Sequence, residues 1–155
     1  MAVNQEAAKA VFAVAALLES QGANPYRVRA YRRAARSLML LPDPLVEYTN
    51  EEGELALPWL GPSLRRRLGE LATRGQLGIQ LEILAALPRW QRELLSVPGV
   101  GPKTARRLER ELGVRSVGGL VRAARRGRIR ALRGFGVKSE RRLADAARAV
   151  LGRAA

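Results

Sequence analysis

The chain has 155 residues, of which 28 are Lys or Arg and 14 are Asp or Glu, so that its formal net charge is +14. It contains neither Cys nor His, which excludes disulfides, thiolate nucleophiles, imidazole bases and ordinary zinc sites. Residues 1–60 hold 6 basic and 7 acidic residues, whereas residues 61–155 hold 22 and 7. This imbalance is typical of a protein whose carboxy-terminal part binds a polyanion.

The composition also predicts the fold class. Aromatic residues make up only 5% of the chain, and Ala, Leu and Arg dominate, all of which lose little side-chain freedom in a helix. We therefore expect an all-α protein. No run approaches the roughly 18 apolar residues that a membrane span requires, so we expect no membrane insertion and a cytoplasmic location.

The amino-terminal part of the chain predicts two helices. Asn4 is expected to cap the first helix, which ends near Gly22. Asn24 followed by Pro25 is typical of a cap and a first helical residue, and opens the second helix, which Pro42 ends. A short helical or extended piece follows, and then a surface loop over residues 49–54.

Three later segments resemble one another: LPWLGPSLRRRL from Leu57, VPGVGPKTARRL from Val97 and LRGFGVKSERRL from Leu132. We interpret them as three helix–turn–helix units. Further helices are expected over residues 80–87, 90–95 and 120–126, and helix C-caps at Gly75, Gly113 and Gly152. The prediction is two small helical lobes built around these repeats, over residues 1–78 and 79–155.

The second and third segments carry glycines two residues apart, followed by a lysine in the first turn of a helix. Such glycines let backbone amides approach an anion, and the helix adds its unpaired amides and its dipole. The alternative is that Gly-x-Gly merely joins two helices tightly and that the arginines form a solvated face. We predict that the phosphate backbone is bound by Gly99, Val100, Gly101, Lys103, Thr104, Arg106, Gly134, Gly136, Lys138 and Ser139.

The first segment departs from this pattern. Trp59 stands in place of the first glycine, and Ser63 stands in place of the lysine. We therefore expect the first unit to be a packing element or a modified site.

The segment from Val97 to Leu108 resembles the helix-hairpin-helix class of DNA-binding motifs. "NPYRVRAYRRAARSL" from Asn24, "LP-x-x-G" at Leu57, "RGQL" at Arg74 and "GFGVKSE" at Gly134 extend the resemblance to the amino-terminal half of bacterial family X DNA polymerases. The resemblance implies a lyase-like domain followed by a DNA-binding lobe, which in the family hold DNA on either side of a gap or nick.

The resemblance also implies a pocket for a 5′-phosphate, made by Tyr26, Arg27, Tyr31, Ser63 and Arg67. The position of the family's Schiff-base lysine is occupied by Arg67. A guanidinium stays protonated and cannot supply that nucleophile, so we expect no catalytic residue here. The alternative is that the two tyrosines are half-buried helix residues and that the nearby arginines are solvated.

The family's polymerase palm holds magnesium with paired aspartates, but the only aspartates here are Asp43 and Asp145. We expect no polymerase activity, no metal site and no cofactor. The resemblance makes turn carbonyls such as those of Val97 and Val100 candidates to hold a monovalent cation.

Our main hypothesis is a non-catalytic, largely sequence-independent DNA-binding protein of the nucleoid, which acts in repair at gapped, nicked or branched DNA. Three alternatives stay open: a lyase that uses Lys9, Lys103 or Lys138, a scaffold that binds protein or RNA, and a piece of a longer family X polymerase. The protein partners are not predicted.

Overall fold

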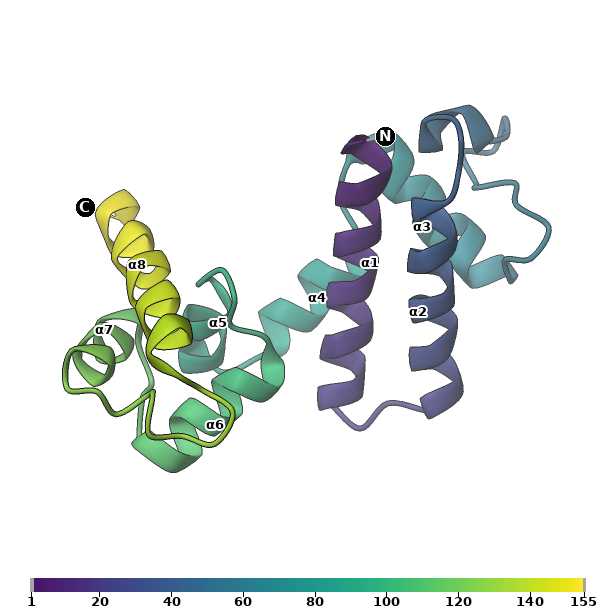
Figure 1. Cartoon of the computed structure of the whole chain (residues 1–155). Helices are drawn as coiled ribbons and strands as arrows, with labels where there is room; N and C mark the ends of the chain where they lie inside the picture. The colour runs from purple at the N-terminus through teal and green to yellow at the C-terminus, as the bar shows by residue number, and fades with distance from the viewer. Residues whose placement is uncertain (1, 155) are drawn as a thin grey trace. The chain divides into compact units, whose positions relative to one another are not determined.

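The computed structural model describes residues 2–154, which form eight α-helices, one 3-10 helix and no β-strand (Figure 1). The predicted all-α class is confirmed. The chain divides into unit 1, residues 1–86, and unit 2, residues 87–155. Unit 1 contains α1 (Ala2–Ser20), α2 (Pro25–Met39), η1 (Leu45–Tyr48), α3 (Pro62–Arg74) and α4 (Gly78–Ala86), and unit 2 contains α5 (Arg89–Leu95), α6 (Pro102–Leu112), α7 (Val117–Arg125) and α8 (Val137–Ala154).

Unit 1 is organised around α1 and α2, which lie side by side and are joined by a short turn (Figure 1). Asn24 caps α2 as predicted, because its Oδ1 accepts a hydrogen bond from the Tyr26 N–H at 2.9 Å. The apolar positions of both helices face each other, and Val11, Val14 and Leu38 are fully buried between them. This pair is the frame on which the rest of unit 1 packs.

Asn4 does not cap the first helix, so that prediction was wrong. The helix already begins at Ala2, and Asn4 lies inside it with only 2% of its surface exposed. Its Nδ2 donates to the Asp43 carbonyl and its Oδ1 accepts from the Leu45 N–H, both at 2.8 Å. The side chain thus ties the segment after α2 to α1, a long-range role that local sequence does not reveal.

The division between the units falls eight residues later than the predicted lobe boundary at residue 78. The reason is that α4 packs on α1 and α3, and buries Ile79 and Ile83 within unit 1. A Gly75 φ of 69° ends α3, as predicted for a C-cap, but the chain returns to the same core afterwards.

The segment that leads to α3 is held tightly against that helix. The Leu55 N–H donates to the Arg65 carbonyl at 2.9 Å. A Cβ at position 69 would clash with the Gly53 carbonyl oxygen, so this close approach requires glycine. These contacts fix residues 53–61, and therefore the first repeated segment, on α3.

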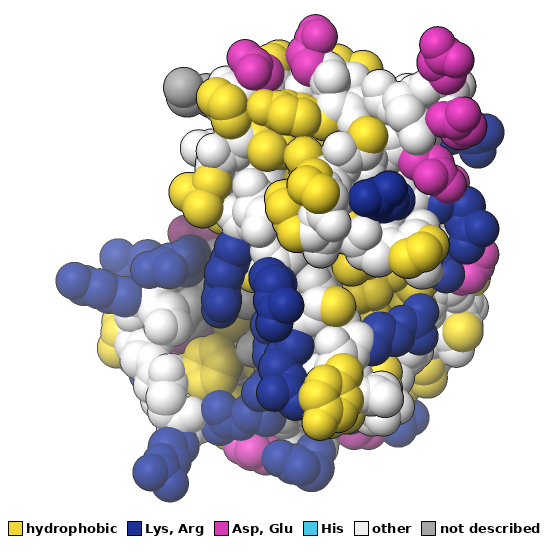
Figure 2. Space-filling model, turned by 90° about the vertical axis from the view of Figure 1, so that its right-hand side faces the viewer, with side chains coloured by type: hydrophobic (Ala, Val, Ile, Leu, Met, Phe, Trp, Pro, Cys, Tyr) yellow, Lys and Arg dark blue, Asp and Glu magenta, His cyan; other side chains and the backbone are white. Residues whose placement is uncertain are grey.

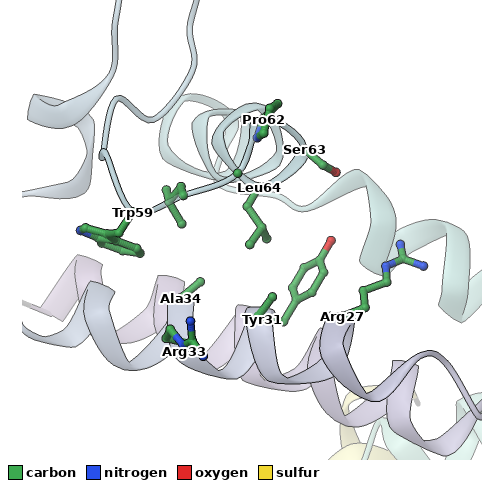
Figure 3. A pocket seen from close by; sticks show the side chains of 11 residues that line it. Arg27, Tyr31, Arg33, Ala34, Trp59, Pro62, Ser63 and Leu64 are labelled. Carbon is green, nitrogen blue, oxygen red and sulfur yellow. The ribbon is translucent and has the colours of Figure 1, made fainter.

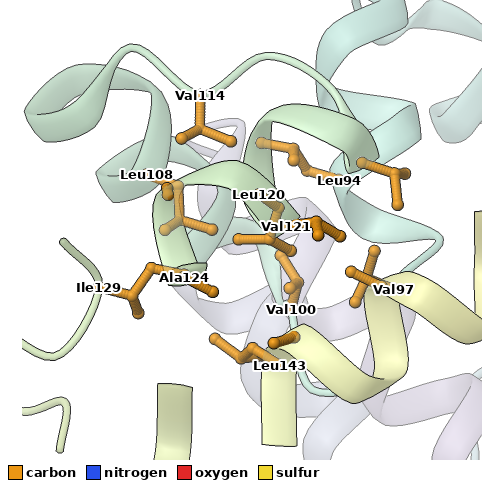
Figure 4. Close-up of a cluster of buried hydrophobic side chains, with 14 of the residues drawn as sticks. Leu94, Val97, Val100, Leu108, Val114, Leu120, Val121, Ala124, Ile129 and Leu143 are labelled. Carbon is orange, nitrogen blue, oxygen red and sulfur yellow. The ribbon is translucent and has the colours of Figure 1, made fainter. Parts of the chain in front are cut away.

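Unit 2 has its own core, shown in Figure 4. Leu94, Leu108, Leu120 and Ile129 are fully buried, each from a different part of the unit. Every helix of unit 2 contributes to this cluster. Gly113, with φ 67°, caps α6 as predicted, whereas Gly152 lies inside α8 and does not end it.

The three repeated segments differ in what precedes their turns. Only in the second does a helix, α5, end directly before the turn. In the first, a single β-bridge between Thr49 and Leu55 stands there, and in the third, residues 126–131 separate α7 from the turn. The prediction of three alike helix–turn–helix units was therefore too simple.

Within residues 2–154, no helix has the length and apolar content needed to cross a membrane.

Candidate nucleic-acid interface

The repeated segments contain three tight turns, which we call the first turn (Leu57–Leu60), the second turn (Val97–Val100) and the third turn (Leu132–Phe135). In each, the N–H of the last residue donates to the carbonyl of the first, at 3.1, 3.0 and 3.0 Å. The third residue is Gly99 in the second turn, with φ 90°, and Gly134 in the third, with φ 87°. A left-handed φ at this position defines a type II turn and explains why glycine is needed there.

The apolar and exposed residues of the second turn point to opposite sides. Val97 and Val100 are buried in the core of unit 2, with 1% and 6% of their surfaces exposed. Gly99 and Gly101 are exposed, and a Cβ built on Gly101 would meet nothing within 4 Å. Gly136 has the same open surroundings. The core therefore anchors the turn, and Gly101 directly after it faces open space, whereas a Cβ on Gly99 would meet the Leu143 side chain at 3.3 Å.

Helix N-termini follow both turns directly. The first helical bond of α6 runs from the Ala105 N–H to the Gly101 carbonyl, and that of α8 from the Glu140 N–H to the Gly136 carbonyl, both at 2.9 Å. The amides of Lys103 and Lys138, and of the residues after them, precede these bonds and so have no acceptor within the helix. Gly101 caps α6 without a side-chain bond.

The charges at these helix starts favour an anion. The side chains of Lys103, Arg106 and Lys138 are exposed, and those of Thr104 and Ser139 are half-buried. The first turn of α6 holds no acidic residue.

Glu140 is the one acidic residue in the first turn of α8, and it is directed inward. Its residue is only 6% exposed, and its carboxylate accepts from the Arg130 N–H at 2.8 Å and pairs with the Arg130 Nε at 3.1 Å. Because the Glu140 carboxylate is buried and paired with Arg130, it does little to oppose an anion at the start of α8.

Arg107 links the second and third repeated segments, a role that the sequence analysis missed. Its Nη1 donates to the Arg133 carbonyl of the third turn at 2.9 Å, and its guanidinium lies 5.4 Å from the centre of the Phe135 ring. The Arg107 Nε also bonds to Glu111 at 3.2 Å, and this bond holds the pKa of Glu111 below its ordinary value. The i, i+4 spacing of Arg107 and Glu111 was visible in the sequence, but the contact with the third turn was not.

The charge of the chain is concentrated in unit 2. That unit holds 18 basic and 5 acidic residues, a net charge of +13, whereas unit 1 holds 10 and 9, a net charge of +1. Figure 2 shows one face of the molecule, on which many Lys and Arg side chains are exposed. Exposed glycines and helix starts on a cationic unit are what a polyanion requires.

Unit 1 carries a separate pocket of about 430 Å³ between α2 and residues 59–64 (Figure 3). Of the residues predicted for a 5′-phosphate pocket, Arg27, Tyr31 and Ser63 line it. Arg27 and Ser63 are exposed, whereas only 3% of the Tyr31 surface is exposed. Three of the five predicted residues are thus brought together.

The other two predicted pocket residues, Tyr26 and Arg67, do not line this cavity. Tyr26 is 76% exposed, and the Arg29 guanidinium lies over its ring at 4.8 Å. Arg67 directs its Nε to the Ser63 hydroxyl at 3.4 Å. It therefore contacts a pocket residue without reaching the cavity itself.

The sequence analysis did not place Trp59, Arg33 or Leu64 in this pocket, yet all three line it. Trp59 occupies the position of Gly99 and Gly134, but within residues 2–154 only glycines have a left-handed φ. The first turn is therefore not of type II, although the same hydrogen bond closes it. The one sequence feature that indicated a different role for this turn was Trp59, an aromatic residue at a position where the other two turns have glycine.

Two residues fit the monovalent cation that the family resemblance implies. The Val97 carbonyl accepts the Val100 N–H at 3.0 Å, while no backbone N–H in residues 2–154 donates to the Val100 carbonyl. Backbone carbonyl oxygens are suitable ligands for such a cation. For the described residues, no cluster of three or more Asp or Glu side chains is placed to hold a metal ion.

Comparison with known proteins identifies the class to which these features belong. A helix-hairpin-helix domain model matches residues 2–77, and a model of the SAM-like helix-hairpin-helix tandem matches residues 92–149. A helix-hairpin-helix model thus matches a region in each unit, and the match in unit 2 contains the hairpin predicted at Val97–Leu108.

The chain is also similar to a particular polymerase. It is 29% identical over 133 residues to the DNA polymerase/3′-5′ exonuclease PolX of Bacillus subtilis (strain 168), a match that covers 86% of this chain and 23% of the relative. The predicted resemblance to bacterial family X polymerases is confirmed. The chain spans about a quarter of the length of this curated relative.

Proposed function

We propose that the protein binds the phosphate backbone of DNA through the second and third turns and the helix starts behind them. The observation that carries this proposal is the repetition of one backbone geometry. Gly99 and Gly134 share a left-handed φ, each turn leads into a helix start with an exposed lysine, and the cap of α6 makes no side-chain hydrogen bond. Two such sites in one unit of net charge +13 fit two stretches of phosphate backbone.

Contacts of this kind recognise charge and shape, so binding is expected to be largely independent of base sequence. If four to six phosphates are engaged, the logarithm of affinity falls with the logarithm of salt concentration with a slope of roughly −4 to −5. A cation at the Val97 and Val100 carbonyls would add positive charge beside the phosphate. We place this activity at gapped, nicked or branched DNA in repair, within the nucleoid.

Unit 1 is proposed to bind a 5′-phosphate without lyase chemistry. Arg27 and Ser63 offer a cation and a hydroxyl, and Arg67 supports Ser63. No lysine is among the described residues that line the pocket, and Lys9 pairs with Glu6 at 2.6 Å on α1. A pocket that keeps the cations and lacks the amine favours binding over Schiff-base formation.

The binding proposal is tested with labelled duplexes that are intact, nicked, gapped or flapped, by fluorescence anisotropy over a range of salt concentrations. Lys103→Glu should weaken binding to all of them and reduce the magnitude of the salt slope by about 1. The matched control is Lys9→Glu, which makes the same charge change at an exposed lysine of unit 1. Equal effects of the two variants, or no salt dependence, would overturn the proposal.

The absence of lyase chemistry is tested separately. Borohydride captures an amine bound to an abasic 5′ end as a covalent adduct. We expect none with the native chain. An adduct that disappears in Lys9→Ala would instead establish the lyase alternative.

A further inference from the structure

We propose that the pocket of unit 1 holds one unpaired nucleotide, whose base stacks on the indole of Trp59. The inference rests on the proposed function, since it takes the chain to be a DNA-binding protein. It goes beyond that function because it assigns a recognised base, and not only a phosphate, to this pocket.

The exposure of Trp59 is the first step. The residue is 46% exposed, whereas Leu57 and Leu60 of the same turn are 7% and 5% exposed. These two leucines supply the packing of the first turn, as Val97 and Val100 do for the second. The core therefore does not explain a large aromatic side chain at this position.

The position of the indole is the second step. Figure 3 shows the Trp59 ring at one end of the pocket, with Tyr31 and Arg27 toward the other end. The glycine that occupies this position in the other two turns would leave this end of the pocket without a flat apolar wall. An exposed indole is a platform on which any base can stack, because every base has a π-face.

The polar groups around the pocket are the third step. Only 3% of the Tyr31 surface is exposed, and its hydroxyl is directed toward the cavity that the residue lines (Figure 3). Arg27 and Arg33 are exposed lining residues, and no carboxylate lines the pocket in the described chain. A ligand that satisfies all of these groups carries a planar ring, a hydrogen-bonding edge and a negative charge.

The size of the pocket selects the form of that ligand. A volume of about 430 Å³ suits one small molecule of nucleotide size. A base that stacks on Trp59 and directs its hydrogen-bonding edge into the pocket is not available for pairing, so the nucleotide is an unpaired one, as at a 5′ flap or an extrahelical position. An apolar side chain of a protein partner would use Trp59 but would leave the two arginines unmatched.

The first test monitors the indole directly. The chain has two tryptophans, and Trp90 packs partly buried against the core of unit 2, so Trp90→Phe leaves Trp59 as the sole tryptophan, whose emission is excited selectively over that of the three tyrosines. The probe is a gapped duplex with a one-nucleotide, 5′-phosphorylated flap. We expect the Trp59 emission to be quenched by the flapped DNA and not by the intact duplex. Quenching by neither DNA, although both bind, would overturn the inference.

The second test is a comparison of affinities. Trp59→Ala should weaken binding of the flapped DNA by about 5- to 100-fold, the usual range for loss of one stacked base, and leave binding of the intact duplex unchanged. Trp59→Phe should restore most of the affinity, because a smaller ring still stacks. Met39→Ala, which truncates another exposed apolar side chain of unit 1, should change neither affinity.

The two proposals fail in different ways. If Trp59→Ala weakens both DNAs equally, or neither, the base-stacking inference is wrong while the proposed backbone binding stands. If the native chain binds neither DNA, the proposed function itself is wrong.

Discussion

The first turn and the second turn are built from the same pattern and closed by the same hydrogen bond, but they present different chemistry. In the second turn, Gly99 takes a left-handed φ and the open backbone leads to an exposed lysine. In the first, Trp59 excludes that conformation, and the following helix carries Ser63 where the second carries Lys103. One residue at one turn position thus decides whether a hairpin offers backbone amides or an aromatic surface.

The largest expected effect comes from giving the third turn a side chain where it needs glycine. Gly134→Val should weaken binding to all duplexes by about 10- to 100-fold, because a branched residue resists φ 87° at a cost of roughly 1–3 kcal/mol and covers the exposed backbone. A built Cβ at Gly134 meets nothing within 4 Å, so the effect is one of backbone conformation and not of core packing.

The control for this variant is Gly152→Ala in α8, where a Cβ likewise meets nothing and φ is helical. It should leave DNA binding unchanged and raise stability by about 0.5–1 kcal/mol. Anisotropy measures the first quantity and denaturant unfolding the second. Native affinity in Gly134→Val would show that the turn backbone takes no part in binding.

Loss of the link between the second and third segments should have the next largest effect. Arg107→Ala removes the bond to the Arg133 carbonyl and the contact with Phe135, each worth about 0.5–1.5 kcal/mol. We expect about a 5-fold loss of affinity for gapped DNA. Arg106→Ala, which removes the same charge from an exposed neighbour, should instead lower the salt slope by about 1. Identical salt slopes for the two variants would argue against a positioning role for Arg107.

A smaller effect is expected from converting the first turn to the sequence of the second. The double variant Trp59→Gly and Ser63→Lys restores a turn glycine and a helix-start lysine. It should steepen the salt slope of duplex binding by about 0.9, as one added phosphate contact does. Trp59→Gly alone should not steepen it, because the cation is still missing. If the single and double variants have the same slope, lysine at this position contacts no phosphate.

The smallest effect concerns acid stability. The Arg107 bond lowers the pKa of Glu111, so the ionised carboxylate contributes stability at neutral pH. That contribution is lost as the pH falls from the ordinary pKa of a glutamate through the lowered one. Glu111 is exposed, so the difference in thermal midpoint between the native chain and Glu111→Gln should be small at pH 7. The two midpoints should converge in acid, and a difference that grows instead would contradict the ion pair.

Much of the fold followed from local signals. Helix caps at Asn24, Gly75 and Gly113 were predicted because each acts within one turn of its own position. Gly152 was mistaken for a cap, because glycine is also tolerated inside a helix near its end. Asn4 was mistaken for one because its partners, the backbone of Asp43 and Leu45, lie about forty residues away.

The candidate sites likewise combine features that the sequence predicted with features that depend on the tertiary structure. The sequence by itself determined the glycine turns, the lysines behind them and the charge of unit 2, since φ preference, helix starts and net charge are properties of short segments. Only the tertiary structure decided that Trp59, Tyr31 and Arg33 share a pocket, that Tyr26 and Arg67 lie outside it, and that Arg107 reaches the third turn. Those facts depend on which segments pack together, and packing is settled by the whole core rather than by neighbours along the chain.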